Sequence, residues 1–227
     1  MTGIENRLIL LRHGQSEANV DHSIYQHKDD HLIELTNLGK SQAESAGEYI
    51  KQIIGDTSRL DVFVSPYTRT MQTWEAVKKG LHRNNINLEI EPRIREQEFQ
   101  VFANSMERAS VFEEQARRGR FWFRFSDAES GVDVFSRICT FLTELRLDRK
   151  VFNTSNDCLV VAHEITLRCI LMKVLKLNIN DFDSLPDIEN CTPIVLKTFD
   201  FKNFTFDEKA TMGNRNLKEY LANAKKV

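Results

Sequence analysis

The sequence predicts an α/β fold built as a three-layer sandwich, with a mostly parallel central sheet between two layers of helices. Three short apolar runs, at residues 8–11, 62–64 and 159–162, indicate buried parallel strands, because strands covered on both faces are almost continuously hydrophobic. Helical segments separate these runs, which is typical of a parallel sheet with helices on both faces. Each run ends in polar residues, and ligands of such sheets bind outside the carboxyl ends of the strands.

The individual elements follow from the same alternation along the chain. Strands are expected near 7–12, 61–65, 87–91, 157–162 and 193–199, with a further antiparallel strand at 203–209. Helices are expected near 38–54, 67–81 and 165–176, and as several pieces within 104–147. Residues 215–225 predict a short amphipathic helix or a frayed end.

A chain of 227 residues is long enough to enclose one large core, and we expect residues 1–227 to form a single domain. The segment of about 99–150 interrupts the alternation and is expected as a helical cap over the carboxyl ends of the strands. Arg117 and Arg118 lie there beside the aromatic residues 121–123 and 125, and one interpretation is a second anion clamp, since arginine binds carboxylate or phosphate with two hydrogen bonds. The alternative is a solvated helix end.

Composition excludes several classes of function. The formal charge of −2 provides no general basic surface for nucleic acid. No segment is apolar enough to predict a membrane span or a secretion signal, so a cytoplasmic protein is expected. The four cysteines lack the paired spacing of a zinc site, and they are expected as reduced, mostly buried thiols with no metal.

The most informative motif is the tripeptide Arg-His-Gly at 12–14, which follows an apolar strand and places His13 beside the fixed cation Arg12. Glycine allows a sharp turn and a close approach to a ligand. Ser16 suits the start of a helix, whose free N–H groups attract anions. Arg69 and His163 follow the ends of two other predicted strands, so the topology would gather all four side chains. The sequence therefore predicts a phosphate site.

Several segments recur in an order that is typical of one family. They are Arg-His-Gly-Gln-Ser at 12–16 with Asn19, the segments 35–43, 65–73 and 94–97, and the strand that ends at His163. The chain thereby resembles the histidine phosphatase superfamily, in the branch with cofactor-dependent phosphoglycerate mutases and fructose-2,6-bisphosphatases, over roughly residues 7–200. Arg-Glu-Gln at 95–97 is most similar to the broad-specificity phosphatases.

The resemblance implies a role for each matching residue. His13 would attack phosphorus and form a phosphohistidine, His163 would donate hydrogen bonds to the phosphoryl oxygens, and Glu96 would protonate the leaving alcohol. Glu98 is a nearby substitute for Glu96. The phosphate-binding positions are Arg12, Asn19, Arg69 and Glu164, and the candidate substrate-binding positions are Gln15, Ser16, Glu98, Arg117 and Arg118.

Two positions depart from the family pattern. Glu164 follows His163 where glycine is common, and a carboxylate there would repel a phosphate unless its side chain turns away or is protonated. The structural alternative is an outward residue at a helix start, which the helix dipole favours. Gln100 stands where glycine often follows the acidic segment, which would reshape the mouth of the site.

We therefore expect a phosphatase that hydrolyses phosphomonoesters through phospho-His13, without a metal or a nucleotide. One alternative is a phosphoglycerate mutase, which would require 2,3-bisphosphoglycerate as its cofactor. The other is a weakly active phospholigand-binding protein, suggested by Glu164 and Gln100. The expected partner is a small phosphorylated metabolite or a phosphoprotein, and the chain is expected to be a monomer or a homodimer.

Overall fold

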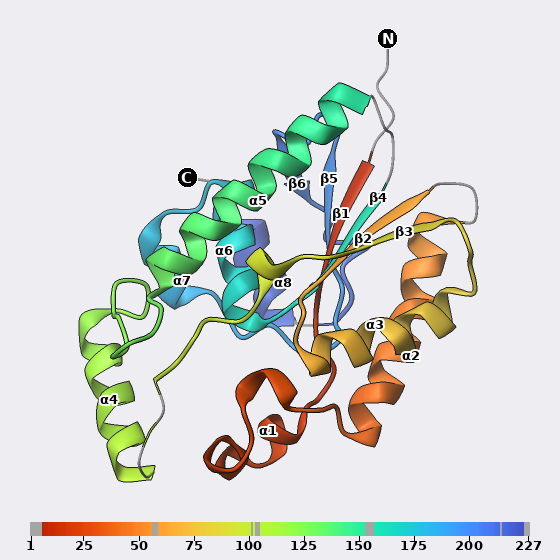
Figure 1. The fold of residues 1–227 in the computed structure, drawn as a ribbon. Coiled ribbons are helices and arrows are strands. Elements are labelled where there is room, and N and C mark those ends of the chain that lie inside the picture. The colour runs from red at the N-terminus through yellow and green to blue at the C-terminus, as the bar shows by residue number, and fades with distance from the viewer. Residues whose placement is uncertain are drawn as a thin grey trace.

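Six strands form one sheet at the centre of the molecule, in the order β3-β2-β4-β1-β5-β6 (Figure 1). The computed structural model describes residues 6–55, 59–100, 102, 105–152, 157–213 and 215–224. The strands are β1 (Asn6–Arg12), β2 (Leu60–Val64), β3 (Ile86–Ile90), β4 (Asp157–Ala162), β5 (Ile194–Thr198) and β6 (Phe204–Phe206). β1, β2, β3 and β4 run parallel, whereas β5 is antiparallel to both β1 and β6. The predicted α/β class and mostly parallel sheet are confirmed.

Helices cover both faces of this sheet. They are α1 (Glu17–Val20), α2 (Asn37–Ile54), α3 (Thr68–Leu81), α4 (Ser105–Arg118), α5 (Gly131–Phe152), α6 (Glu164–Leu175), α7 (Ile179–Ser184) and α8 (Arg215–Ala224). Three 3-10 turns accompany them: η1 (His22–Gln26), η2 (Asp30–Leu32) and η3 (Pro92–Ile94). In Figure 1, α2 and α3 cover one face, and α5 and α6 cover the other.

The apolar run of β1 shows why two helical layers form. Successive side chains of a strand point to opposite faces. Leu8 and Leu10 pack in the core beneath α5 and α6, while Ile9 and Leu11 pack in the core beneath α2 and α3. All four side chains are fully buried. A strand of this kind is stable only with helices on both sides, because each face is hydrophobic.

Helices α4 and α5 make up most of the segment predicted as a cap, about 99–150, of which residues 101, 103 and 104 lie outside the described residues. Helix α5, which makes up its second part, packs on the sheet through Val134, Ile138, Phe141 and Leu145. Those residues recur at the spacing of one helix face, so α5 buries an apolar stripe in the main core. Helix α4 stands away from the sheet, at the end of the molecule where α1 also lies (Figure 1). The extent of the cap over the strand ends stays a prediction.

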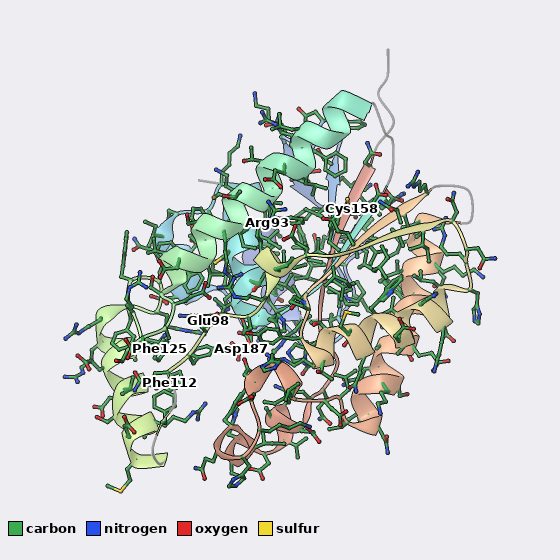
Figure 2. All side chains as sticks on the ribbon, in the orientation of Figure 1. Arg93, Glu98, Phe112, Phe125, Cys158 and Asp187 are labelled. Atoms are coloured by element: carbon green, nitrogen blue, oxygen red, sulfur yellow. The ribbon has the colours of Figure 1, made fainter. Side chains whose placement is uncertain are left out.

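Aromatic side chains hold the cap together. Phe112 of α4 lies 5.5 Å from Phe125, and Phe99 lies 5.0 Å from Phe125, measured between ring centroids. Figure 2 shows Phe112 and Phe125 beside α4. Phe125 is 1% exposed, so the cap has a small core of its own. Gln100 contributes a hydrogen bond by accepting from the backbone N–H of Ser126 at 3.2 Å.

The remaining general expectations concern cysteines, metals and membranes. All four cysteines are free thiols, and Cys158, Cys169 and Cys191 are buried. The described part of the chain contains no group of three or more His, Cys, Asp or Glu side chains arranged to hold a metal ion. In the same residues, no helix has both the length and the apolar character needed to cross a membrane.

Candidate active site

His13 lies immediately after β1 and is fixed by the ends of neighbouring segments. Its backbone N–H donates to the carbonyl of Ala162 at 3.0 Å, which ties the end of β1 to the end of β4. Its ring Nδ1 lies 2.8 Å from the carbonyl oxygen of Gly14. A carbonyl only accepts, so Nδ1 carries the proton and Nε2 keeps a free lone pair. This tautomer is the one that a nucleophilic Nε2 requires.

Gly14 allows this turn because the chain passes very close to α2. A Cβ added at Gly14 would lie 2.3 Å from the carbonyl oxygen of Gly39, and one added at Gly39 would lie 2.1 Å from that of Gln15. Two glycines therefore pack backbone against backbone. Helix α2 begins at this contact, where Thr36 Oγ1 accepts from the N–H of Gly39 at 3.0 Å.

His163 follows β4 and faces His13. The two ring centroids lie 5.4 Å apart, although the residues come from distant parts of the chain. Ser65, at the end of β2, places its hydroxyl 2.7 Å from Nε2 of His163. The other ring nitrogen, Nδ1, is buried and has no hydrogen-bond partner within the described residues. With Ser65 donating to Nε2, His163 Nδ1 carries a proton and can donate to a ligand oxygen.

Both histidines have a pKa well below the usual value. Burial is the main cause for His13 and for His163, and the positive charges of Arg69 and Arg12 lower both further. Both rings are therefore neutral at pH 7. A bound phosphate would oppose the effect of the arginines, and it would favour a proton on His163.

Arg69 lies in the first turn of α3 and is only 3% exposed. Its Nη1 donates to the backbone carbonyl of Asp30 at 2.6 Å and to Oδ1 of the same residue at 2.9 Å. Its guanidinium also lies 4.9 Å from the centroid of the Tyr67 ring. The place of Arg69 beside the histidines is thus compatible with its predicted pairing with phosphate. In this structure, however, its partner is the Asp30 carboxylate of η2. No sequence pattern points to Asp30, since its partner lies in a different element.

Arg12 and Glu164 contact each other directly. Arg12 Nη1 lies 3.0 Å from Glu164 Oε2 and donates to the carbonyl of Ile188 at 2.6 Å. Glu164 Oε1 accepts from Nε and Nη2 of Arg168 at 3.2 and 3.0 Å. The structural alternative of an outward Glu164 at a helix start is not what is observed, because the side chain is 18% exposed and contacts two arginines. Its role as a direct phosphate ligand stays a prediction.

Glu96 lies close to these charges. Burial raises the pKa of Glu96 to about 7; the charges of Asp30 and Glu164 act in the same direction, and Arg69 opposes them. A carboxyl group with this pKa is protonated in part of the molecules at neutral pH and can act as an acid. Glu98 differs, since its side chain is 53% exposed and pairs with Arg95 at 3.3 Å.

An arginine of α5 holds the segment that carries Glu96. Arg137 Nη1 donates to the carbonyl of Arg95 at 2.9 Å, and Nη2 donates to the carbonyl of Glu96 at 3.1 Å. Arg137 also pairs with Glu129 at 2.9 Å. Sequence reasoning missed this residue, because nothing in the pattern of α5 links it to a loop that precedes it by forty residues.

Three polar residues after His13 organise the loop that follows it. Asn19 Oδ1 accepts from the backbone N–H of Ser16 at 3.0 Å, and Gln15 Oε1 accepts from Thr36 at 2.9 Å. Ser16 is 1% exposed, and α1 extends over only four residues. Asn190, which sequence reasoning missed, donates to the carbonyl of His13 at 2.8 Å. Asn19 is exposed and has its amide nitrogen available for a ligand.

Among the described residues, no contact links the predicted arginine clamp of the cap to the histidines. Arg118 pairs with Glu114 at 2.6 Å on the exposed surface of α4, and Arg117 is exposed beside it. Arg108, also in α4, lies near enough to Tyr25 of η1 for its charge to lower the pKa of that side chain, against the larger effect of burial. Its guanidinium lies 4.9 Å from the centroid of the Phe112 ring. Substrate binding by Arg117 and Arg118 stays a prediction.

Comparisons with known proteins identify the family of the chain. Residues 8–207 match the histidine phosphatase superfamily (branch 1). The phosphoglycerate mutase-like protein AT74H of Arabidopsis thaliana is 34% identical over 218 residues, which cover 89% of this chain and 78% of that protein. The phosphoglycerate mutase-like protein AT74 of the same plant is 36% identical, over 80% of this chain and 61% of its own length. The broad-range acid phosphatase DET1 of Saccharomyces cerevisiae is 23% identical over 84% of each chain.

Solved structures share the fold at low sequence identity. A mycobacterial glucosyl-3-phosphoglycerate phosphatase in complex with VO3 superposes with a TM-score of 0.70 at 23% identity, over 89% of this chain and 97% of that one. The protein YhfR of Bacillus stearothermophilus gives a TM-score of 0.72 at 18% identity, over 92% and 98% of the two chains. These likenesses concern the fold, while the family match extends over most of the sequence. The chain therefore belongs to the histidine phosphatase superfamily, branch 1.

Proposed function

We propose that this protein hydrolyses phosphomonoesters through a phosphohistidine formed on Nε2 of His13. The observation that carries the proposal is the arrangement of the two histidines: His13 has Nδ1 on the Gly14 carbonyl, and His163 lies 5.4 Å away with its Nδ1 unpaired. One ring then supplies a lone pair and the other a hydrogen-bond donor. Phosphoryl transfer needs this combination of an oriented nucleophile and donors for the phosphoryl oxygens.

The first step breaks the ester bond. Nε2 of His13 forms a bond to phosphorus, the bond between phosphorus and the ester oxygen breaks, and Glu96 gives its proton to the departing alcohol. Arg12, Arg69 and the Nδ1–H of His163 stabilise the charge on the phosphoryl oxygens. Arg69 exchanges Asp30 for the phosphate in this step.

The second step restores the enzyme. The Glu96 carboxylate, which lost its proton in the first step, takes a proton from water as the water oxygen attacks phosphorus. The bond between phosphorus and Nε2 of His13 breaks, and inorganic phosphate leaves. In a mutase, a sugar acid rather than water would accept the phosphoryl group, and some relatives carry that name, such as the 2,3-bisphosphoglycerate-dependent phosphoglycerate mutase of Elusimicrobium minutum, 24% identical.

The two reasons to expect a weakly active binding protein lose force in the structure. Glu164 shares its charge between two arginines instead of facing the site alone. Gln100 anchors the cap through its bond to Ser126. We therefore favour the enzyme, whose partner would be a small phosphorylated compound. We propose no metal or nucleotide in the reaction, with 2,3-bisphosphoglycerate needed only for the mutase alternative.

The test is a panel of phosphoesters, assayed with and without 2,3-bisphosphoglycerate, for wild type and His13→Ala. We expect wild type to release phosphate without the bisphosphate and His13→Ala to lose this activity. Brief incubation with a ³²P-labelled substrate should label wild type with an acid-labile, base-stable phosphate. His82→Asn is the matched control, because His82 is exposed at the left-handed end of α3. Equal turnover by wild type and His13→Ala would refute the enzyme, and activity only with the bisphosphate would favour the mutase.

A further inference from the structure

Three charged side chains form a chain of contacts behind the predicted phosphate site. Arg12 contacts Glu164 at 3.0 Å, and Glu164 contacts Arg168 at 3.0 Å. Arg12 and Glu164 are 16% and 18% exposed at their side chains, and Arg168 is 0% exposed. A buried carboxylate destabilises the fold unless it is paired, and a carboxylate beside an anion site also repels the anion. Glu164 is paired with both cations, and Arg168 also contacts Oδ1 of Asp187 at 3.0 Å, so no charge of this network is left without a partner.

Arg168 also anchors the other group that holds Arg12. Its Nη1 donates to the carbonyls of Phe182 and Leu185, at 3.1 and 2.5 Å. These carbonyls belong to α7 and to the loop after it, and the same loop supplies the Ile188 carbonyl that accepts from Arg12 at 2.6 Å. Arg168 therefore fixes both the Glu164 carboxylate and the loop that positions this carbonyl.

The nitrogens of the Arg12 guanidinium consequently differ in their contacts. Its Nη1 is bound to Glu164 and Ile188, whereas its Nε is buried without a hydrogen-bond partner among the described residues. A guanidinium binds an oxyanion best through two adjacent N–H groups, and the edge with Nε is the one still available. Rotation of the guanidinium would break both contacts of Nη1.

We propose that Glu164 and Arg168 are positioning residues that hold the Arg12 guanidinium with its Nε edge toward the phosphoryl group. This inference rests on the proposed function for the identity of the anion. Glu164 acts through Arg12 and does not touch the phosphate. Without its carboxylate, Arg12 would lose a contact that fixes its orientation, and the buried Arg168 would keep only Asp187, at 3.0 Å, as a charge partner among the described residues.

The first test is Glu164→Gln, with inorganic phosphate alone as the probe. Binding is measured by calorimetry, and kcat and KM are measured with one phosphoester. A misplaced catalytic group commonly costs about 100-fold, and loss of a supporting contact about 10- to 100-fold. We expect phosphate binding and kcat/KM to fall within that range. Glu219→Gln is the matched control, because Glu219 also pairs with an arginine four residues away, Arg215, but on the exposed surface of α8.

A double-mutant cycle separates positioning from general structural support. If Glu164 acts through Arg12, then Glu164→Gln should cost little once Arg12→Ala has removed the guanidinium. Arg168→Lys provides a second, milder variant, since lysine keeps the charge but cannot bridge Glu164 and two carbonyls at once. Near-ultraviolet circular dichroism confirms that each variant is folded before its kinetics are compared.

The outcomes distinguish this inference from the proposed function. Phosphate binding by Glu164→Gln that equals or exceeds that of wild type would overturn the inference, and so would equal costs of Glu164→Gln with and without Arg12. A lowered melting temperature with unchanged phosphate binding would also overturn it. If wild type binds inorganic phosphate through this network but hydrolyses no phosphoester, the proposed function fails and the inference stands.

Discussion

Replacement of Glu96 by glutamine tests the proton donor of the proposed reaction. Glutamine keeps nearly the same shape, and it can still accept the hydrogen bond that Glu96 receives from the backbone N–H of Gln97 at 3.0 Å. It cannot give a proton to a leaving alcohol. The substitution therefore removes the acid while it disturbs the packing of the loop very little.

The size of the effect follows from the raised pKa of Glu96. Burial raises this pKa from the usual 4.5 to about 7. At pH 7, about half of the molecules then carry the proton, against about 0.3% for an unperturbed glutamate. General acid catalysis contributes roughly 100- to 10,000-fold where the leaving group needs a proton. We expect Glu96→Gln to lower kcat for alkyl phosphates by about 100-fold or more, and for nitrophenyl phosphate by less than about 10-fold.

The assay compares kcat for a series of phosphoesters between pH 5 and 9. In wild type, hydrolysis of alkyl phosphates should fall as the pH rises through about 7, because Glu96 loses its proton there. Glu96→Gln should lack this decline. An equal loss for alkyl and nitrophenyl substrates would refute the assignment and would show that another group is the acid.

The same pKa shift predicts a change in stability with pH. The folded protein holds the Glu96 proton more tightly than the unfolded chain does, so the free energy of unfolding falls as the pH rises from 4.5 through about 7. The loss is at most about 3 kcal/mol, and less because Glu96 is partly exposed. Glu96→Gln should therefore raise the melting temperature relative to wild type at pH 8 and not at pH 4. A Glu96→Gln variant that is no more stable than wild type at pH 8 would contradict the raised pKa.

Three further predictions test other parts of the site. Ser65→Ala removes the hydroxyl 2.7 Å from His163 Nε2 and should lower kcat by about 5- to 150-fold, the equivalent of 1–3 kcal/mol; unchanged kinetics would show that Ser65 does not fix the tautomer. Arg69→Ala should weaken binding of inorganic phosphate and lower kcat about 100-fold or more, and near-normal titrations would contradict its role. Gly39→Ala should lower both the melting temperature and kcat, because its Cβ would lie 2.1 Å from a backbone oxygen of the catalytic loop. Gly80→Ala is equally crowded, but at the contact of α2 with α3, and it should lower the melting temperature alone. Equal kinetic effects of the two glycine variants would exclude a specific role for the loop contact.

The sequence alone was sufficient for the fold class and for the family. The apolar runs determine where the strands lie, because hydrophobic burial on both faces is a local property of a strand. The Arg-His-Gly motif and the strand that ends at His163 placed the two histidines at neighbouring strand ends. Their distance of 5.4 Å follows from the parallel register of β1 and β4, in which Arg12 pairs with Ala162.

Helix α5 shows what the sequence leaves open about the segment predicted as a cap. The alternation of strands and helices is interrupted between Pro92 and Val151, and the sequence predicts one cap over about 99–150. The stripe formed by Val134, Ile138, Phe141 and Leu145 already indicated a helix that packs on a large core. The sequence contained the signal, but not which hydrophobic surface the stripe would meet.

Tertiary structure alone decided the partners of the charged side chains. Local sequence specifies that Glu164 begins a helix after His163, but its contact with Arg12 depends on how β1 and β4 pair. Likewise, Arg69 meets Asp30 only because η2 folds back over α3. Ionic contacts act over a few ångströms between segments far apart in the chain, whereas the hydrophobic periodicity of a segment depends on its own residues alone. The sequence thus determined the elements and the reactive groups, and the fold determined the charge, the tautomer and the orientation in which those groups are held.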